Sequence, residues 1–252
     1  MTTKQLDAFF RSLLDIEGFR DADASLNGLQ VDNSGGGVAK IAFAVDAALE
    51  TFKRCTDCGA GMLFVHHGLF WGKDRSITGF LRERLCFLLE HNIALYAVHL
   101  PLDQDPVLGN NIGLAQMLGI EAPEPFGLYH GKMVGYRGRL KKPLTVNEAV
   151  EALGAGNKKP LVFPFGKTVN ESCAVVSGGG AGEALQALDA EVDLFVTGEM
   201  SHTVYHPVLE GGLNMISFGH YESETVGVTR VMETCKTQLA IDTEFIDVPT
   251  GL

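Results

Sequence analysis

Long apolar runs are absent from this sequence, and no hydrophobic stretch approaches the roughly 18 residues of a membrane span. The N-terminal stretch, MTTKQLDAFFRSLLDIEGF, carries acids within its apolar pattern, which predicts an amphipathic helix rather than a signal peptide. Cysteine is scarce, and its odd number of scattered residues suits a reducing compartment: Cys55, Cys58, Cys86, Cys173 and Cys235. We therefore expect a cytoplasmic protein that does not enter a membrane.

Basic residues are also fewer than acidic ones: the sequence has 20 lysines and arginines and 31 aspartates and glutamates, which gives a formal net charge of -11. Such a balance repels nucleic-acid phosphates and anionic lipids, while it is compatible with the capture of cations. A nucleic-acid partner is therefore not expected. The 252 residues are 46% hydrophobic, enough for a large core, and near this length chains begin to divide into domains.

The first half of the chain alternates strand and helix patterns. Three short apolar runs predict strands over Lys40–Val45, Met62–Val65 and Ile93–Val98. Amphipathic patterns predict helices over Ala47–Cys58, Thr78–His91 and Asn110–Leu118. This alternation is typical of βαβ units around a mainly parallel sheet.

Prolines at Ala122–Pro125 mark a plausible domain boundary, and similar patterns follow it. The later elements are a helix over Val146–Leu153 and strands over Lys132–Leu140, Cys173–Ser177, Leu194–Thr197 and Asn214–Phe218. A last predicted strand, Glu244–Val248, is compatible with either sheet. The sequence thus predicts an α/β fold of two similar α/β/α domains with mainly parallel or mixed sheets. The first is 1–124 with a C-terminal segment of about 220–252, and the second is 125–219.

Histidines and acids fall where the predicted strands end. His66 and His67 follow one strand, His99 and Asp103 follow the next, and His220 follows a later one. Ligands collect at the carboxyl ends of parallel strands, where loops from distant parts of the chain converge. These residues are therefore candidates for one site.

The adjacent pair His66 and His67 allows two interpretations. Neighbouring strand residues point to opposite faces, so the two share one ion only if the strand has ended. Otherwise each serves a different ion of a close pair, which we favour. Considered alone, the dipeptide is more often a pair of surface or core histidines.

Carboxylates supply the charge that neutral imidazoles lack. Asp103 is the favoured candidate in VHLPLDQDP, because Asp105 precedes a proline and is typical of a turn. His220 and Glu224 are four residues apart at the start of a helix, so they share a face. A glutamate there is also ordinary dipole compensation, but its two oxygens are able to bridge two cations.

A further pair, Glu199 and His202, lies just past a strand. The two side chains are candidates for a general acid–base pair or for substrate binding. Equally, the segment is a helix N-terminus capped by Thr197 or Ser201.

Two other motifs have simpler interpretations. Cys55-x-x-Cys58 lacks a second ligand pair and sits on a predicted helix, which argues against structural zinc. The glycine-rich Gly178–Gly182 follows a strand and is interpreted as a tight structural turn, with a phosphate cradle as the alternative. Ser-His-Asp catalysis is not favoured because no G-x-S-x-G elbow is present.

Several motifs in fixed order resemble the NIF-three-like family, also called GTP cyclohydrolase type 2 homologues, in its short bacterial form. They span nearly the whole chain: NGLQV (Asn27–Val31), VHHGLFW (Val65–Trp71), HLPLD (His99–Asp103) with GNN (Gly109–Asn111), TGEMSH (Thr197–His202) and GHYESE (Gly219–Glu224). The N-terminal motif lacks the usual glycine directly after Val31.

The resemblance implies a specific metal site. It places His67 and Asp103 on one ion and His66 and His220 on the other, with Glu224 bridging. All five positions hold the expected residue type. The resemblance also implies a ring-shaped homohexamer. Iron, manganese and zinc all suit three imidazoles and two carboxylates.

The expected function is a dinuclear-metal hydrolase acting on a small molecule, including a cyclohydrolase-type ring opening of a purine nucleotide. Paired cations lower the pKa of water and polarise the bond attacked, and His99, Glu199 or His202 is then available to shuttle protons. The alternative is a non-enzymatic metal-binding scaffold or regulatory protein that acts through its ring. Redox chemistry at a di-iron centre is a third, less favoured option.

Overall fold

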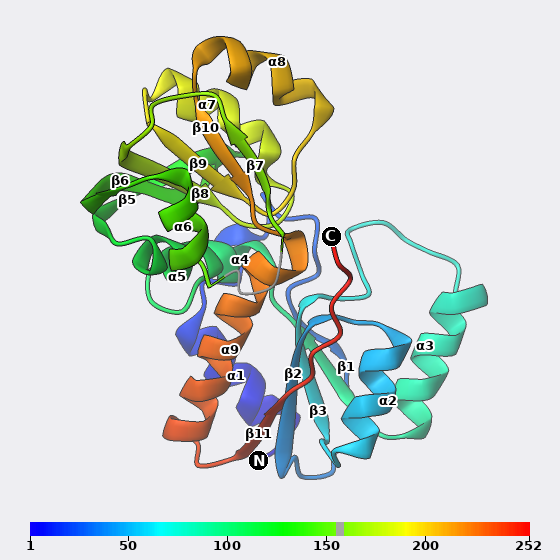
Figure 1. Cartoon of the computed structure of the whole chain (residues 1–252). Coiled ribbons are helices and arrows are strands. Elements are labelled where there is room, and N and C mark those ends of the chain that lie inside the picture. The colour runs from blue at the N-terminus through cyan, green and yellow to red at the C-terminus, as the bar shows by residue number, and fades with distance from the viewer. Residues whose placement is uncertain (155–158) are drawn as a thin grey trace. The chain divides into compact units, whose positions relative to one another are not determined.

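The computed structural model describes residues 1–154 and 159–252, which form two compact units. Unit 1 comprises Met1–Leu102 and Val228–Val248, and unit 2 comprises Asp103–Gly227 and Pro249–Leu252. Each unit has its own β-sheet flanked by helices (Figure 1). The predicted α/β fold with two sheets is confirmed.

The sheet of unit 1 has five strands in the order β1-β4-β3-β2-β11. Strands β2, β3, β4 and β11 run parallel to their neighbours, and β1 is antiparallel to β4 at one edge. The last strand, for which the sequence left both sheets open, pairs with β2 at the other edge of this sheet. The strand bounds are β1 (Gly28–Val31), β2 (Lys40–Asp46), β3 (Met62–His67), β4 (Ala94–Ala97) and β11 (Asp242–Phe245).

Helices cover both faces of this sheet (Figure 1). Side chains alternate between the faces, so Phe64 and Tyr96 point toward α1, where Phe10 packs 5.0 and 4.7 Å from their ring centroids. Phe52 of α2 joins the cluster that covers the opposite face. The helices are α1 (Thr3–Leu13) with the last part of α9 (His220–Gln238) on one face, and α2 (Leu49–Asp57) with α3 (Gly79–Glu90) on the other.

The sheet of unit 2 is mixed, with six strands in the order β5-β6-β8-β9-β10-β7. Only the β8–β9 and β9–β10 pairs are parallel, and the flanking pairs are antiparallel. The strands are β5 (Ile120–Tyr129), β6 (Lys132–Leu144), β7 (Leu161–Pro164), β8 (Asn170–Val176), β9 (Leu194–Thr197) and β10 (Asn214–Ser217).

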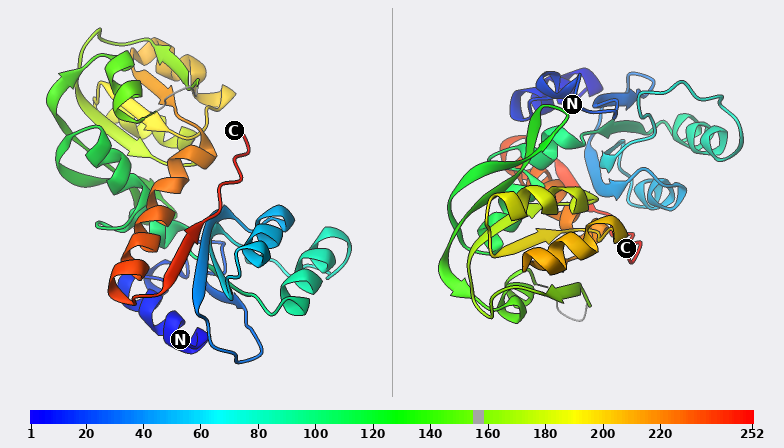
Figure 2. Two further views of the ribbon diagram at one scale, coloured as in Figure 1. Left: turned by 60° about the horizontal axis from the view of Figure 1, so that its bottom comes forward. Right: turned by 90° about the horizontal axis from the view of Figure 1, so that it is seen from above.

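Two pairs of helices flank this second sheet. Residues of α5 and α6 share one core cluster with Val175, Val196 and Ile216 of the strands. Helices α7 and α8 pack against each other on the other face, as Figure 2 also shows. The bounds are α5 (Asn110–Met117), α6 (Val146–Ala152), α7 (Ala184–Asp189) and α8 (His202–Gly211), with α4 (Leu100–Gln104) where the first unit passes into the second.

The proline-rich segment is not a linker. Pro123 and Pro125 lie inside β5, and the division of the chain falls earlier, after Leu102. Proline has no N–H to donate, so a strand tolerates it at the edge of a sheet, where β5 lies. The second division falls after Gly227, within α9, rather than near residue 220. Among the described residues, no helix combines the length and apolarity needed to cross a bilayer.

Candidate metal site

Two histidines end strand β3, and hydrogen bonds fix both rings. The Nδ1–H of His66, which is fully buried, donates to the carbonyl of Val98 over 2.9 Å. The Nδ1–H of His67 donates to the carboxylate of Asp46 over 2.9 Å. Although regular strand alternation would separate the two side chains, their ring centroids lie 4.7 Å apart. Because Nδ1 carries the proton in both rings, Nε2 is the nitrogen suited to a cation.

His99 follows β4 and joins this pair. One nitrogen from each of His66, His67 and His99 lies within 4.8 Å of the others. The three imidazoles therefore form a candidate metal-binding group within unit 1.

The NGLQV motif supports these loops. Asn27 accepts from the backbone N–H of His99 over 2.7 Å and donates to Asp23 over 2.8 Å. Gln30 accepts from the backbone N–H of Leu69, just past the histidine pair, over 2.7 Å. The role of this motif, unresolved from the sequence, is thus to hold the two histidine-bearing loops.

In unit 2, Asp103 is a buried carboxylate rather than a surface turn residue. Its Oδ1 accepts from Asn110 over 2.9 Å and from the hydroxyl of Ser177 over 2.8 Å. Asn110 in turn accepts from the backbone N–H of Gly227 over 2.6 Å, which ties α5 to α9. The neighbouring Asp105 accepts from two backbone N–H groups, so it is the turn residue that the sequence predicted.

His220 and Glu224 occupy the first turns of α9 on one helical face, as their spacing predicted. Nε2 of His220 lies 3.2 Å from Oε1 of Glu224, and Nδ1 lies 2.5 Å from Oε1 of Glu199. Burial lowers the pKa of His220, but the two carboxylates outweigh this effect and raise it to about 9. The Glu224 side chain is 3% exposed. Glu199 and Glu224 thus place negative charge on both sides of the His220 ring, which favours a cation there, either a proton or a metal ion.

The glycine-rich turn contacts this pair. Gly178 donates its N–H to the hydroxyl of Ser223 over 3.0 Å, and its carbonyl accepts from the N–H of Glu199 over 2.9 Å. A Cβ at Gly178 would overlap Oε1 of Glu224. The turn continues into a short 3-10 helix, Gly180–Glu183, and into the six residues of α7. It is therefore a close-packed structural turn, as favoured, and it fits around the candidate ligands.

The side chains of Glu199 and His202, the second candidate pair, do not share a site. Glu199 contacts His220, whereas His202 is exposed as the first residue of α8. Ser201 caps that helix by accepting from the N–H of Thr203. Beside Glu199 lies a pocket of about 570 Å³, whose lining includes Lys159, Leu161, Met200 and Phe218.

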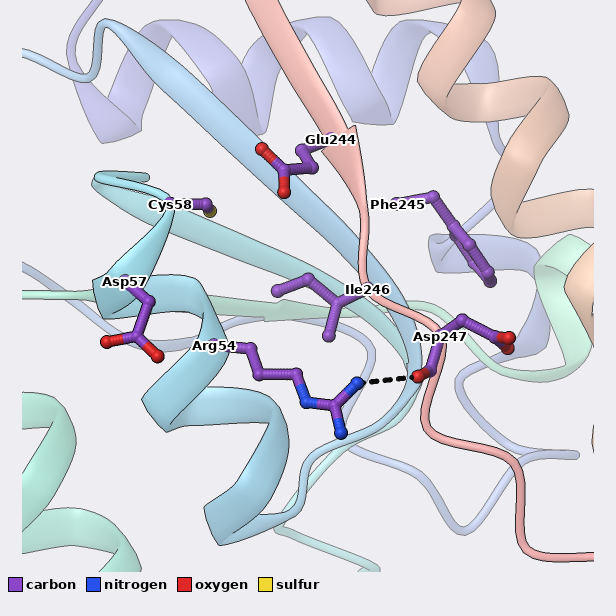
Figure 3. A pocket seen from close by; sticks show the side chains of 7 residues that line it. All are labelled: Arg54, Asp57, Cys58, Glu244, Phe245, Ile246 and Asp247. Atoms are coloured by element: carbon purple, nitrogen blue, oxygen red, sulfur yellow. Dashed lines mark hydrogen bonds between the residues drawn. The ribbon is translucent and has the colours of Figure 1, made fainter.

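The Cys55–Cys58 motif is not a metal knuckle. Burial raises the pKa of Cys55 to about 12, and the thiol of Cys58 donates to the carbonyl of Cys55. In the described parts of the chain, no group of three potential metal donors includes either cysteine. Cys58 instead lines a pocket of about 400 Å³ between α2 and β11, across which Arg54 donates to the carbonyl of Asp247 over 3.0 Å (Figure 3).

Several supporting residues were not predicted from the sequence. Asp46 ends β2, as the histidines end or follow their strands. Its position at the end of a strand could therefore have identified it from the sequence. Ser177 directly follows β8 and carries the strand-end signal too. Asp23 and Asn110 carry no such signal, because a loop and a helix bring them to their partners.

The fold and these groups define an α/β protein with candidate metal-binding groups built from histidine and carboxylate side chains. A family profile described as Duf34/NIF3 (NGG1p interacting factor 3) matches residues 1–250. The chain belongs to this family, as its motifs predicted.

Two relatives align over 100% of both chains and are named GTP cyclohydrolase 1 type 2 homolog. The Treponema pallidum protein is 39% identical over 286 residues, and the Archaeoglobus fulgidus protein is 42% identical over 252 residues. A crystal structure from Thermus thermophilus matches with a TM-score of 0.91 at 37% identity over 100% of both chains. Reduced HcgD from Methanocaldococcus jannaschii matches with a TM-score of 0.86 at 27% identity over 98% of both.

Proposed function

We propose that the chain is a hydrolase that depends on two divalent metal ions, iron, manganese or zinc, held by His66, His67, Asp103, His220 and Glu224. One observation carries this proposal. Each of these imidazoles has its Nδ1 held by a carbonyl or carboxylate oxygen, from Val98, Asp46 and Glu199 respectively. Metal-binding histidines characteristically have this support, because it fixes the tautomer and presents Nε2.

The donor set fits hydrolytic chemistry. Divalent ions bound there would lower the pKa of water and polarise the bond that is attacked. Glu199 holds His220 in place, and its carboxylate is 48% exposed, so it is able to pass protons between this position and solvent. Asn110 and Ser177 fix the orientation of the Asp103 carboxylate by donating to its Oδ1.

The substrate is proposed to be a nucleotide or another phosphorylated small molecule. The pocket beside Glu199 is lined by Lys159, whose positive charge suits a phosphate, and by Leu161 and Met200, whose apolar side chains suit a ring; Glu199 and Glu222 line it as well and suit hydrogen-bond donors of a base. The name of the relatives favours a purine nucleotide such as GTP, with ring opening as the reaction. We also propose that the protein works in the cytoplasm as a homohexamer, which sedimentation equilibrium would test.

The experiment has two stages. Elemental analysis of freshly purified protein should give about two metal equivalents per chain, and His67→Ala or Glu224→Gln should lower that number. His91→Ala and Glu233→Gln are matched controls, because both side chains are exposed elsewhere on helical segments. The metal-loaded protein is then assayed against a panel of nucleotides and phosphoesters.

Turnover that His67→Ala and Glu224→Gln abolish, while both variants remain folded by circular dichroism, would support the hydrolase. Two bound ions without turnover of any compound would instead favour the non-enzymatic, metal-binding role. No bound metal in the wild-type protein would contradict the proposal altogether.

A further inference from the structure

The pocket beside Glu199 lies where two parallel strands of unit 2 end. Thr197 of β9 and Leu161 of β7 both pair with Ser217, the last residue of β10. Most of the lining comes from the ends of β9 and β10 and from the start of β7: residues 198–200, 217–219 and 159–161. Ligands of α/β sheets collect at such strand ends. The volume of about 570 Å³ is in the range of pockets that hold small molecules.

One wall of this pocket carries a carboxylate that is not among the proposed metal ligands. Glu222 lies in the first turn of α9, between His220 and Glu224 in sequence. Side chains two positions apart on a helix point about 200° away from each other, so Glu222 does not share the face of these two ligands. Its Oε2 lies against Gly219, where a Cβ would overlap it, and both residues line the pocket. The Glu222 carboxylate thus belongs to the pocket.

We propose that Glu222 selects guanine as the base of the substrate, by accepting from the N1–H and the N2 amino group of the ring. The proposal rests on the proposed function in taking this pocket as the nucleotide site. It goes further by naming the base and the residue that recognises it. A carboxylate only accepts hydrogen bonds, and its two oxygens match two adjacent N–H donors of a planar ring. Guanine presents this pair of donors, whereas adenine presents an acceptor at N1.

The other residues of the pocket suit the remaining parts of such a ligand. Lys159 supplies a positive charge for the phosphate, and Leu161 and Met200 supply apolar side chains for the faces of the purine. Glu199 also lines the pocket, but its Oε1 accepts from Nδ1 of His220, so this carboxylate serves that ring. Recognition of the base is therefore assigned to Glu222.

A glutamate in the first turn of α9 also has a purely structural role. Its negative charge compensates the positive end of the helix dipole, and this role is indifferent to the base of a bound nucleotide. Glutamine near a helix N-terminus keeps the hydrogen bonds that a glutamate makes there. Base preference in a Glu222→Gln protein therefore separates recognition from helix stabilisation.

The test measures binding of GMP, IMP, XMP and AMP to the full-length protein as purified, by equilibrium dialysis. The four nucleotides share ribose and phosphate and differ only in the purine. We expect GMP to bind about 10–100-fold more tightly than IMP, which lacks the N2 amino group, because a hydrogen bond to a charged group contributes about this factor. AMP and XMP should also bind more weakly than GMP, because each places an acceptor against the carboxylate.

Glu222→Gln should reverse the preference between GMP and XMP. The glutamine amide oxygen accepts from N1–H, but its NH₂ group meets the N2 amino group of guanine, so GMP affinity should fall by about 10–100-fold. The same NH₂ group donates to the C2 carbonyl of xanthine, so XMP should bind more tightly than GMP. Glu233→Gln is the matched control, since Glu233 is exposed on the same helix, and it should leave all four affinities unchanged.

Two outcomes overturn the inference while the proposed hydrolase survives. In one, the wild type binds the four nucleotides equally. In the other, Glu222→Gln weakens all four by the same factor, as a structural role alone would. Binding of none of them would overturn the inference together with the nucleotide substrate. The metal-dependent hydrolase is tested separately, by the metal content and turnover of His67→Ala and Glu224→Gln.

Discussion

A single methyl group at Gly178 should disrupt the unit 2 ligands without removing any of them. Gly178 has φ of +59°, and a Cβ there would overlap Oε1 of Glu224 and lie 3.2 Å from Nε2 of His220. The left-handed conformation costs an L-residue roughly 1–2 kcal/mol. Displacing the buried carboxylate from its partner adds roughly 1–3 kcal/mol. Gly178→Ala should therefore lower the free energy of unfolding by about 2–5 kcal/mol.

The adjacent Gly179 is a matched control, because its φ is -78° and no atom lies within 4 Å of a Cβ placed there. Gly179→Ala should change stability by less than about 1 kcal/mol. Urea denaturation measures both variants, and elemental analysis measures their metal content. The reasoning about this turn would be refuted by a Gly178→Ala protein that matches Gly179→Ala in stability and in bound metal.

Three further outcomes are expected. The pKa of Asp193 is below its ordinary value because the hydrogen bonds to its carboxylate, from Lys167 first, outweigh the opposing effect of burial. The stability that the ionised Asp193 gives the folded protein is therefore fully present above about pH 3.8, its ordinary pKa. That stability is lost as the pH falls through the lower pKa that Asp193 has in the folded protein. Asp193→Asn should cost about 1–2 kcal/mol at pH 7 and progressively less below pH 4 in urea titrations. Replacing Cys55 by alanine and Cys58 by serine should leave metal content unchanged by elemental analysis, and a loss of metal would restore the zinc-knuckle interpretation. Phe64→Ala, at a fully buried site stacked on other rings, should cost about 3–5 kcal/mol of unfolding free energy, and a cost below about 1 kcal/mol would contradict that packing.

Local patterns were sufficient to predict most of the elements. The strand over Leu194–Thr197 was predicted with the bounds observed, and the predicted helix near Thr78–His91 differs from α3 only at its ends. Short apolar runs and helical periodicity are local properties, so they can be read without the rest of the chain. The edge strands β1, β5 and β7 were missed. In β5 the prolines look like a linker, and only its place at the sheet edge shows why they are tolerated.

The candidate metal donors, like the strands and helices, were predicted only in part. The sequence by itself determined the donor types, since histidines and acids at strand ends and an i, i+4 pair are visible in order along the chain. It could not determine which nitrogen of each ring is presented. That depends on Val98, Asp46, Asp23 and Glu199, whose partners are 21 to 76 residues away along the chain. Hydrogen bonds over such separations exist only once the sheets have formed, so only the tertiary structure decided how these donors are aimed.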